Sequence, residues 1–230
     1  MGGVIHPLFY FSGGFLDWYV VDKKYIHYLT QFDSRIGYVE YGKRLKLHGG
    51  ILLTIGDFHY YVPISSAKPK HQKMSNSLDF HKLLDESTGY LYAVLNINNM
   101  IPVPDNCLTQ LKYNQVESFR SFSNEKEKTD YVYLLQKEKA LIDNVQDTLQ
   151  NKAMKLYQKC IAKPDSSLAA RCCNFKMLEE KCSSFYDGIS SVIVWSRKSS
   201  RIISSHLRYF FILRACLSSV SYTHLTLPTT

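Results

Sequence analysis

The order of hydrophobic and polar residues divides the chain into a first half with strand patterns and a second half with a helical pattern. Four short apolar runs in the first half are separated by polar or glycine-containing segments: residues 18–21, 50–55, 58–64 and 90–97. Such runs are typical of strands, and Gly56-Asp57 between two of them predicts a hairpin. Asp22 can cap a short helix that reaches Phe32. We therefore expect a small, strongly twisted antiparallel sheet with one or two helices in this half.

From Asp105 onward the apolar residues recur with helical spacing. The longest such pattern covers residues 131–161, and Pro164 ends it because proline cannot continue a helix. Asn174 can cap a last helix that begins with Phe175. The patterns together predict an α+β fold, with the sheet in the first half and packed helices mainly in the C-terminal half.

The length and the ends of the chain suggest one main domain with additions. The chain has 230 residues, 45% of them hydrophobic, which is enough for a core. We expect this domain to cover residues 15–186. Residues 187–230 keep neither a helical nor a strand period, and Ser221–Thr230 resembles a translated sequencing adapter. We therefore interpret residues 187–230 as a tail that is not native, and residues 1–14 as an upstream extension.

The charge distribution points to a polyanionic partner. The net charge is +8, and the segment from Phe15 to Lys82 holds ten Lys/Arg against six Asp/Glu. A face that binds nucleic acid requires such a basic surplus. The six cysteines show no paired Cys-x-x-Cys spacing, so we do not expect a zinc site. No apolar run approaches the roughly 20 residues of a membrane span, and no signal peptide is evident, so we expect a cytoplasmic protein without a membrane partner.

The candidate chemistry lies where an apolar strand runs into a turn, in Tyr60–His71. Pro63 is expected to limit that strand to a sheet edge or to its last residues. RNA can be cut without a metal if a base removes the 2′-OH proton, donors or cations stabilise the phosphorane, and an acid protonates the leaving 5′-oxygen. Ser65 and Ser66 can donate to phosphate oxygens, and Lys68 supplies a positive charge. A solvated turn without function is compatible with the same string.

Other residues of this half could contribute to RNA binding. His71 and His81 have an ordinary pKa near 6.5, which suits an acid and base pair, although surface histidines are often bystanders. Tyr25 and Lys46 reach the same cleft if the first helix packs beside the hairpin; otherwise they are a core tyrosine and a surface lysine. Tyrosines interleaved with lysines suit base stacking beside phosphate contacts. Walker, dinucleotide-binding and serine-hydrolase motifs are not found.

Four strings of the sequence, taken in order, resemble one known family. They are Lys24-Tyr25-Ile26-His27-Tyr28-Leu29 with Phe32-Asp33, then residues 61–68 (YVPISSAK), 95–103 (LNINNMIPV) and 173–181 (CNFKMLEEK). Together they resemble the ToxN/AbiQ family, the endoribonuclease toxins of type III toxin-antitoxin systems. The resemblance extends from about Trp18 to Tyr186.

The resemblance implies a fold, an activity and partners. The implied fold is MazF/Kid-like, and the implied activity is a metal-independent RNase without a cofactor that leaves a 2′,3′-cyclic phosphate. Its implied substrate and partner is a repetitive antitoxin RNA, whose released pseudoknots inhibit the toxin in a closed hetero-oligomer. Such toxins act in abortive infection against phage.

The resemblance also assigns roles by motif position. Ser66 takes the place of the essential serine, Lys68 that of the active-site lysine, and Ser65 that of a family hydroxyl. The implied RNA contacts are Tyr25, Lys46 and a second tyrosine, either Tyr41 or Tyr38; Lys70 and His71 follow the catalytic turn and are expected to contact RNA or solvent. Two other classes remain open: a non-catalytic RNA-binding module that uses the same basic face, and a helical protein whose C-terminal helices bind another protein.

Overall fold

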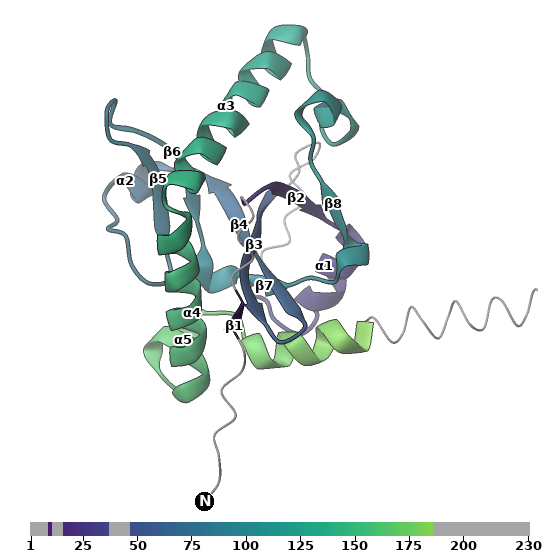
Figure 1. Cartoon of the computed structure of the whole chain (residues 1–230), viewed down its shortest axis with the longest axis vertical. Coiled ribbons are helices and arrows are strands. Elements are labelled where there is room, and N and C mark those ends of the chain that lie inside the picture. The colour runs from purple at the N-terminus through teal and green to yellow at the C-terminus, as the bar shows by residue number, and fades with distance from the viewer. Residues whose placement is uncertain (1–8, 11–15, 37–46, 186–230) are drawn as a thin grey trace, which may run out of the picture. The chain divides into compact units, whose positions relative to one another are not determined.

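The computed structural model describes residues 9–10, 16–36 and 47–185 (Figure 1). The expectations for the tail at residues 187–230, for Lys46 and for Tyr41 therefore lie outside the described residues. The compact unit described below ends at Ser184.

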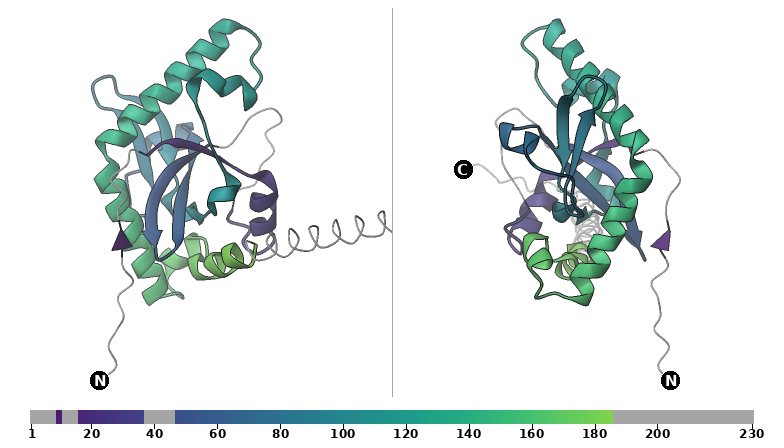
Figure 2. Two further views of the ribbon diagram at one scale, coloured as in Figure 1. Left: turned by 45° about the vertical axis from the view of Figure 1, so that its right-hand side comes forward. Right: turned by 90° about the vertical axis from the view of Figure 1, so that its left-hand side faces the viewer.

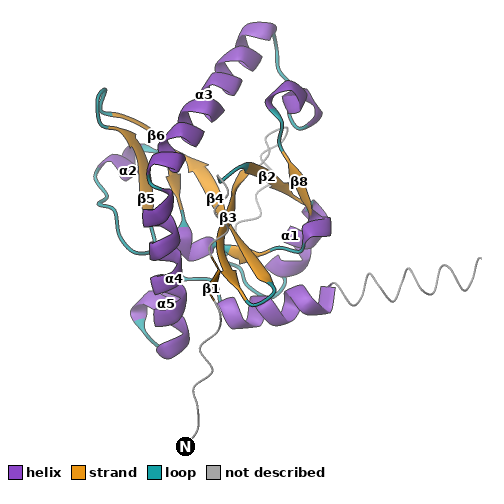
Figure 3. Cartoon of the chain, viewed as in Figure 1, coloured by secondary structure: helices purple, strands orange, loops and turns teal. Residues whose placement is uncertain are grey.

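Eight strands among the described residues form one antiparallel sheet in the order β5-β6-β4-β3-β2-β8, with β7 beside β4 and β1 beside β3 (Figures 1 and 3). The strands are β1 (Phe9–Tyr10), β2 (Trp18–Val21), β3 (Leu47–Ile55), β4 (Phe58–Ser66), β5 (His81–Asp85), β6 (Tyr90–Leu95), β7 (Ile101–Pro102) and β8 (Leu108–Gln110). The α+β prediction is confirmed, with the sheet mainly in the first half and the long helices in the second.

The predicted hairpin is formed by β3 and β4. The two strands meet at Gly56-Asp57, and Gly56 has a φ of 56°, a conformation that glycine adopts without steric strain. Gly50 also allows a close approach, since a Cβ there would lie 3.1 Å from the backbone nitrogen of Asp17, which is a tight contact. The hairpin therefore forms where local turn chemistry predicts it.

Pro63 marks a change of neighbour along β4. The pairing with β3 reaches Pro63, opposite His48, whereas Ile64 pairs with Leu95 of β6 on the other side. The strand nevertheless continues to Ser66. Pro63 is thus the last residue of β4 for which pairing with β3 is described. The expected sheet edge is wrong, because β6 and β7 lie along the other side of β4, but the alternative holds, since Pro63 lies close to the end of the strand at Ser66.

Helices surround the sheet. They are α1 (Lys23–Thr30), α2 (Pro69–Gln72), α3 (Glu125–Asn144), α4 (Gln146–Ala162) and α5 (Ser167–Arg171), the 3₁₀ helices η1 (Ile97–Asn99), η2 (Asp105–Cys107) and η3 (Tyr113–Ser118), and a last helix at 175–185. The side chain of Asp22 accepts the Lys24 N–H at 2.7 Å, and that of Asn174 accepts the Met177 N–H at 3.2 Å. Both predicted N-caps are confirmed.

Two expectations for the second half are wrong. The pattern at 131–161 belongs to two helices rather than one, because the backbone leaves helical geometry at Val145, with φ −120° and ψ 12°. The region after Asp105, expected to be helical, instead contains β8, which pairs with β2. A strand of three residues is too short for its alternation to be visible in the sequence.

The long helices cover one side of the sheet (Figure 2). Helices α3 and α4 run along it, with Lys152 of α4 contacting His81 of β5, while the short α2 lies on the other side. The indole N–H of Trp18 donates to the Leu135 carbonyl of α3 at 3.3 Å, which joins β2 to that helix. The end of β4 therefore belongs to a sheet that is supported by packed helices.

Candidate active site

The two candidate serines are the last residues of β4. Ser65 pairs with Val94 and Ser66 with Ala93 of β6, so the strand is regular to its end. Because side chains alternate along a strand, the two hydroxyls lie on opposite sides of the sheet. Ser65 is half-buried and Ser66 is exposed. The predicted catalytic pair is therefore not equivalent: one hydroxyl is held within the fold and the other faces solvent.

Ser65 is oriented by Asn96, a residue that reasoning from residue types did not single out. The Asn96 side-chain amide donates to Ser65 Oγ at 3.1 Å, while its backbone N–H donates to the Pro63 carbonyl at 3.3 Å. The Asn96 carbonyl in turn accepts the Asn99 N–H at 3.0 Å. No acceptor for the Ser65 hydroxyl is found among the described residues, so its hydrogen is available to a ligand. The only signal in the sequence was the position of Asn96 within the string at residues 95–103.

Ser66 and Lys68 are both exposed and available. Among the described residues, none forms a hydrogen bond with Ser66 Oγ or an ion pair with the Lys68 amine. The backbone at Lys68 is extended, with φ −126° and ψ 156°, as the following Pro69 favours. A hydroxyl donor and a cation thus stand two residues apart where the strand ends, and Lys70 is exposed one residue beyond Pro69.

His71 lies inside the turn rather than on its surface. Its side chain is only 7% exposed, packs against Phe80 at 5.8 Å between ring centroids, and accepts the Lys68 N–H through Nδ1 at 3.1 Å. Burial lowers the pKa of His71, and the neighbouring charges of Lys70 and Lys68 lower it further. A buried ring cannot lie against RNA, so the expected RNA contact of His71 is corrected to a contact within the protein.

His81 does not complete an acid and base pair with His71. It is buried in β5, and its Nδ1 lies 3.0 Å from the Lys152 amine of α4. Burial, followed by the Lys152 charge, lowers the pKa of His81 to about 4. The imidazole is therefore neutral near pH 7 and packed on the side of the sheet that α4 covers, which suits a structural role rather than proton transfer.

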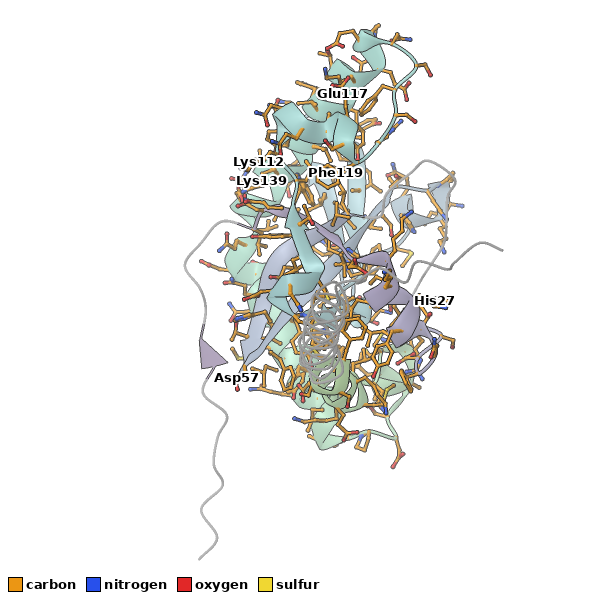
Figure 4. The ribbon with its side chains drawn as sticks, turned by 90° about the vertical axis from the view of Figure 1, so that its right-hand side faces the viewer. His27, Asp57, Lys112, Glu117, Phe119 and Lys139 are labelled. Atoms are coloured by element: carbon orange, nitrogen blue, oxygen red, sulfur yellow. The ribbon has the colours of Figure 1, made fainter. Side chains whose placement is uncertain are left out.

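Tyr25 is a core residue. It is fully buried, and its hydroxyl donates to the Pro102 carbonyl at 2.7 Å, which joins α1 to β7. Burial, followed by the proximity of Cys182, raises its pKa far above the ordinary value. The RNA contact expected from the resemblance is therefore contradicted by this placement. On the same helix, His27 is exposed at the outer surface (Figure 4).

Hydrogen bonds between distant segments join three of the strings of the resemblance. The Asn174 N–H donates to the Asp33 carboxylate at 2.8 Å, and the Cys173 N–H donates to the Asn98 carbonyl at 2.9 Å. These two bonds join the strings at residues 24–33, 95–103 and 173–181, which are far apart in the sequence. These three strings therefore have a structural function, because they hold distant segments of the fold together, whereas the string at 61–68 carries the candidate serines and Lys68.

A second polar cluster anchors β4 itself. Glu179 is 5% exposed, and one of its oxygens accepts the hydroxyls of Tyr60 and Tyr157, each at 2.8 Å. The other oxygen lies 2.9 Å from the Lys176 amine. Because Tyr60 precedes Ser66 on β4 and Tyr157 belongs to α4, the carboxylate links the strand of the candidate site to two helices.

Within the described ranges, no group of three or more His, Cys, Asp or Glu side chains could hold a metal ion. In the part of the chain that the structure describes, no helix combines the length and the apolar character that crossing a bilayer requires.

Two named relatives align with most of the chain. Endoribonuclease AbiQ of Lactococcus lactis subsp. lactis is 27% identical over 177 residues, which cover 73% of this chain and 88% of AbiQ. Endoribonuclease ToxN of Bacillus thuringiensis subsp. kurstaki is 28% identical over 174 residues, which cover 73% of this chain and 82% of ToxN.

Three solved structures also have a fold similar to that of this chain. A type III toxin that is selectively inhibited by a non-coding RNA pseudoknot superposes with a TM-score of 0.64 at 26% identity, covering 75% of this chain and 99% of that one. The lactococcal anti-phage endoribonuclease AbiQ gives a TM-score of 0.64 at 25% identity, covering 76% and 99%. A structure from a bacterial antiviral system regulated by a processed non-coding RNA gives 0.61 at 25% identity, covering 73% and 98%.

The sequence model of one family, "Toxin ToxN, type III toxin-antitoxin system", matches residues 17–183. This range contains all four strings, the whole of β4 and the turn that carries Lys68. The resemblance seen in the sequence is confirmed: the chain belongs to the ToxN toxin family of type III toxin-antitoxin systems.

Proposed function

We propose that this chain is an endoribonuclease toxin that cuts RNA by attack of a 2′-OH on the adjacent phosphate, leaving a 2′,3′-cyclic phosphate. The observation that carries the proposal is the exposed Ser66 hydroxyl and the exposed Lys68 amine at the end of a strand that is anchored to the core. An extended backbone places residues i and i+2 on one side, so both groups are suited to contact one phosphate.

The roles follow from the chemistry of each group. Ser66 orients the scissile phosphate through its hydroxyl and relays the 2′-OH proton to water as the 2′-oxygen bonds to phosphorus. Lys68 stabilises the charge of the phosphorane, and the P–O5′ bond then breaks as the 5′-oxygen takes a proton from water. Ser65, held by Asn96, donates its free hydrogen to a flanking phosphate oxygen. Lys46 and Lys70 supply further phosphate contacts, and Tyr41 supplies a base contact. The residues at 15–186 are proposed to be the functional domain.

The partners follow from the family. We propose that the chain cleaves its own repetitive antitoxin RNA as well as cellular or phage RNA, and that a folded antitoxin repeat then inhibits it in a closed assembly. An exposed site at a strand end is accessible to a folded RNA as well as to a single strand. The proposed setting is the cytoplasm during phage infection, in line with the anti-phage endoribonuclease among the structural relatives.

Matched substitutions test the site. We expect Ser66→Ala and Lys68→Ala each to lower cleavage by about 10²- to 10³-fold, the usual effect of removing one donor from a site that stabilises developing charge. Ser75→Ala and Lys73→Ala change the same residue types at exposed positions of the same loop and are the controls. The assay measures growth inhibition on expression and, with purified protein and total RNA in EDTA, the appearance of cyclic-phosphate ends. Undiminished cleavage by the Ser66→Ala variant would refute the assignment of Ser66 as a catalytic residue.

A non-catalytic RNA-binding module is the second candidate function, because the exposed lysines of the loop suit phosphate contacts without cleavage. It predicts RNA binding that weakens steeply with salt, but no cyclic-phosphate ends for the unchanged protein. The same incubation of total RNA therefore separates the two functions.

A further inference from the structure

We infer that His71 is a positioning residue for the active-site turn, in which its ring holds the backbone of Lys68 in the conformation that presents the amine. The inference rests on the proposed function, because it takes Lys68 as the cation of the site. This positioning role within the protein takes the place of the RNA contact that the sequence predicted for His71.

The first observation is a reciprocal pair of hydrogen bonds between Lys68 and His71. The His71 N–H donates to the Lys68 carbonyl at 2.8 Å, and the Lys68 N–H donates to His71 Nδ1 at 3.1 Å. The bond to Nδ1 is one half of a capping box, in which the third residue of a helix reaches back to the N–H of the capping residue; the other half is replaced by the Lys68 carbonyl, since a lysine side chain has no acceptor. Glu or Gln usually does this, and here an imidazole does it at the start of α2. The loop is thus closed around Pro69.

The second observation is that the ring connects this loop to the core. Pro69, Lys70, Gln72 and Lys73 are all exposed, whereas the His71 side chain is buried against Phe80, the residue before β5. The Met74 N–H also donates to the His71 carbonyl at 3.2 Å. Within α2 and its flanking lysines, His71 is the buried residue. The position of Lys68 therefore depends on this ring.

The third observation concerns the charge state that the hydrogen bond needs. Nδ1 accepts the Lys68 N–H only while it carries no proton; a protonated Nδ1 would be a donor facing a donor. Burial and the charges of Lys70 and Lys68 all disfavour the imidazolium and lower the pKa of His71 below its ordinary 6.5. These two lysines are the charged groups that act on the ring. The bond is consequently intact at neutral pH and lost in acid.

Two substitutions of similar shape separate the acceptor from the bulk of the side chain. His71→Gln keeps an acceptor of the kind found in ordinary capping boxes and does not titrate, whereas His71→Met has a similar length without that acceptor. Cleavage of an oligoribonucleotide that spans a site mapped on total RNA is measured from pH 5 to 8 with the full chain, together with the thermal unfolding midpoint.

We expect His71→Met to lower kcat by about tenfold or more, because small misplacements of catalytic groups reduce rates strongly. We expect the kcat of His71→Gln to stay within about threefold of that of the unchanged protein at pH 7.5. The kcat of the unchanged protein should decline at acid pH as the bond is lost, and His71→Gln should not show this decline. Equal losses of kcat in both variants, a wild-type kcat in His71→Met, or an unchanged acid decline in His71→Gln would each overturn the inference. If His71→Met does not fold, the pH profile of His71→Gln decides alone.

The same experiment separates this inference from the proposed function. If Lys68→Ala and Ser66→Ala cleave the oligoribonucleotide at the full rate, the proposed active site is wrong. If those variants are inactive while His71→Met is fully active, the active site stands and the positioning role fails.

Discussion

Replacing Glu138 by Gln should stabilise the protein at alkaline pH and have much less effect in acid. Glu138 lies on α3 with only 6% of its surface exposed, and among the described residues its carboxyl has neither an ion pair nor a hydrogen bond. Burial raises the pKa of Glu138 from 4.5 to about 7. A carboxyl in such a place is tolerated when protonated and unfavourable when ionised.

The magnitude follows from the difference between the folded and unfolded pKa. The folded state holds the proton more tightly, so this group lowers the free energy of unfolding as pH rises from about 4.5 to about 7, and the loss is complete above that range. A shift from 4.5 to about 7 corresponds to about 3 kcal/mol at most. Between pH 5 and pH 8 the relative gain of Glu138→Gln should thus grow by about 2 kcal/mol, or about 4–8 °C in Tm.

Urea unfolding followed by circular dichroism at pH 5 and pH 8 measures this gain. Glu86→Gln is the matched control, because Glu86 is an exposed carboxylate in the turn before β6 and should show no such difference. The reasoning would be refuted by a gain for Glu138→Gln that is equal at both pH values. It would also be refuted by a loss of stability at pH 8, because a loss would mean that the ionised carboxyl is stabilised in the folded state.

Two further predictions concern the support of β4. Glu179→Ala leaves the buried hydroxyls of Tyr60 and Tyr157 without their acceptor, so it should lower the free energy of unfolding by about 2–4 kcal/mol. Tyr60→Phe removes only one of these hydrogen bonds and should lower it by about 1 kcal/mol. Urea unfolding measures both changes. Asn96→Ala removes the donor to Ser65 and should lower cleavage several-fold at an almost unchanged Tm; a cleavage rate equal to that of the unchanged protein would show that the orientation of Ser65 does not matter.

Local features of this fold were predictable because they depend on a few adjacent residues. The hairpin turn needs a residue that tolerates a positive φ, and Gly56 supplies it within the pair Gly56-Asp57. Asp22 and Asn174 have side chains that accept N–H groups two or three residues ahead, which begins a helix at each place. The end of that strand was not predicted: it was expected at Ile64, with Ser65 and Ser66 in the turn, whereas β4 continues to Ser66 because β6 pairs with it there.

Features that depend on distant partners were not predictable. The pattern of Leu108–Gln110 becomes a strand only because β2 lies beside it. Tyr25 was expected to contact RNA. Whether a tyrosine on a helix is buried depends on residues that are distant in the sequence; here one of them is Pro102, whose carbonyl accepts the Tyr25 hydroxyl. His71 was misjudged for the same reason, since its burial depends on Phe80. Polar residue types alone do not reveal which of them face inward.

The change of neighbour at Pro63 explains why the candidate site lies at the end of β4. Up to Pro63 the strand is paired with β3, whereas from Ile64 to Ser66 the only described strand beside it is β6. The pairing with β6 holds the backbone of Ser65 and Ser66 in an extended conformation, in which their side chains alternate between the two sides of the sheet. The strand is tied to the helices through Tyr60 and Glu179, and to the segment after β6 through Asn96. The candidate site therefore lies where an anchored strand passes into the exposed turn that carries Lys68.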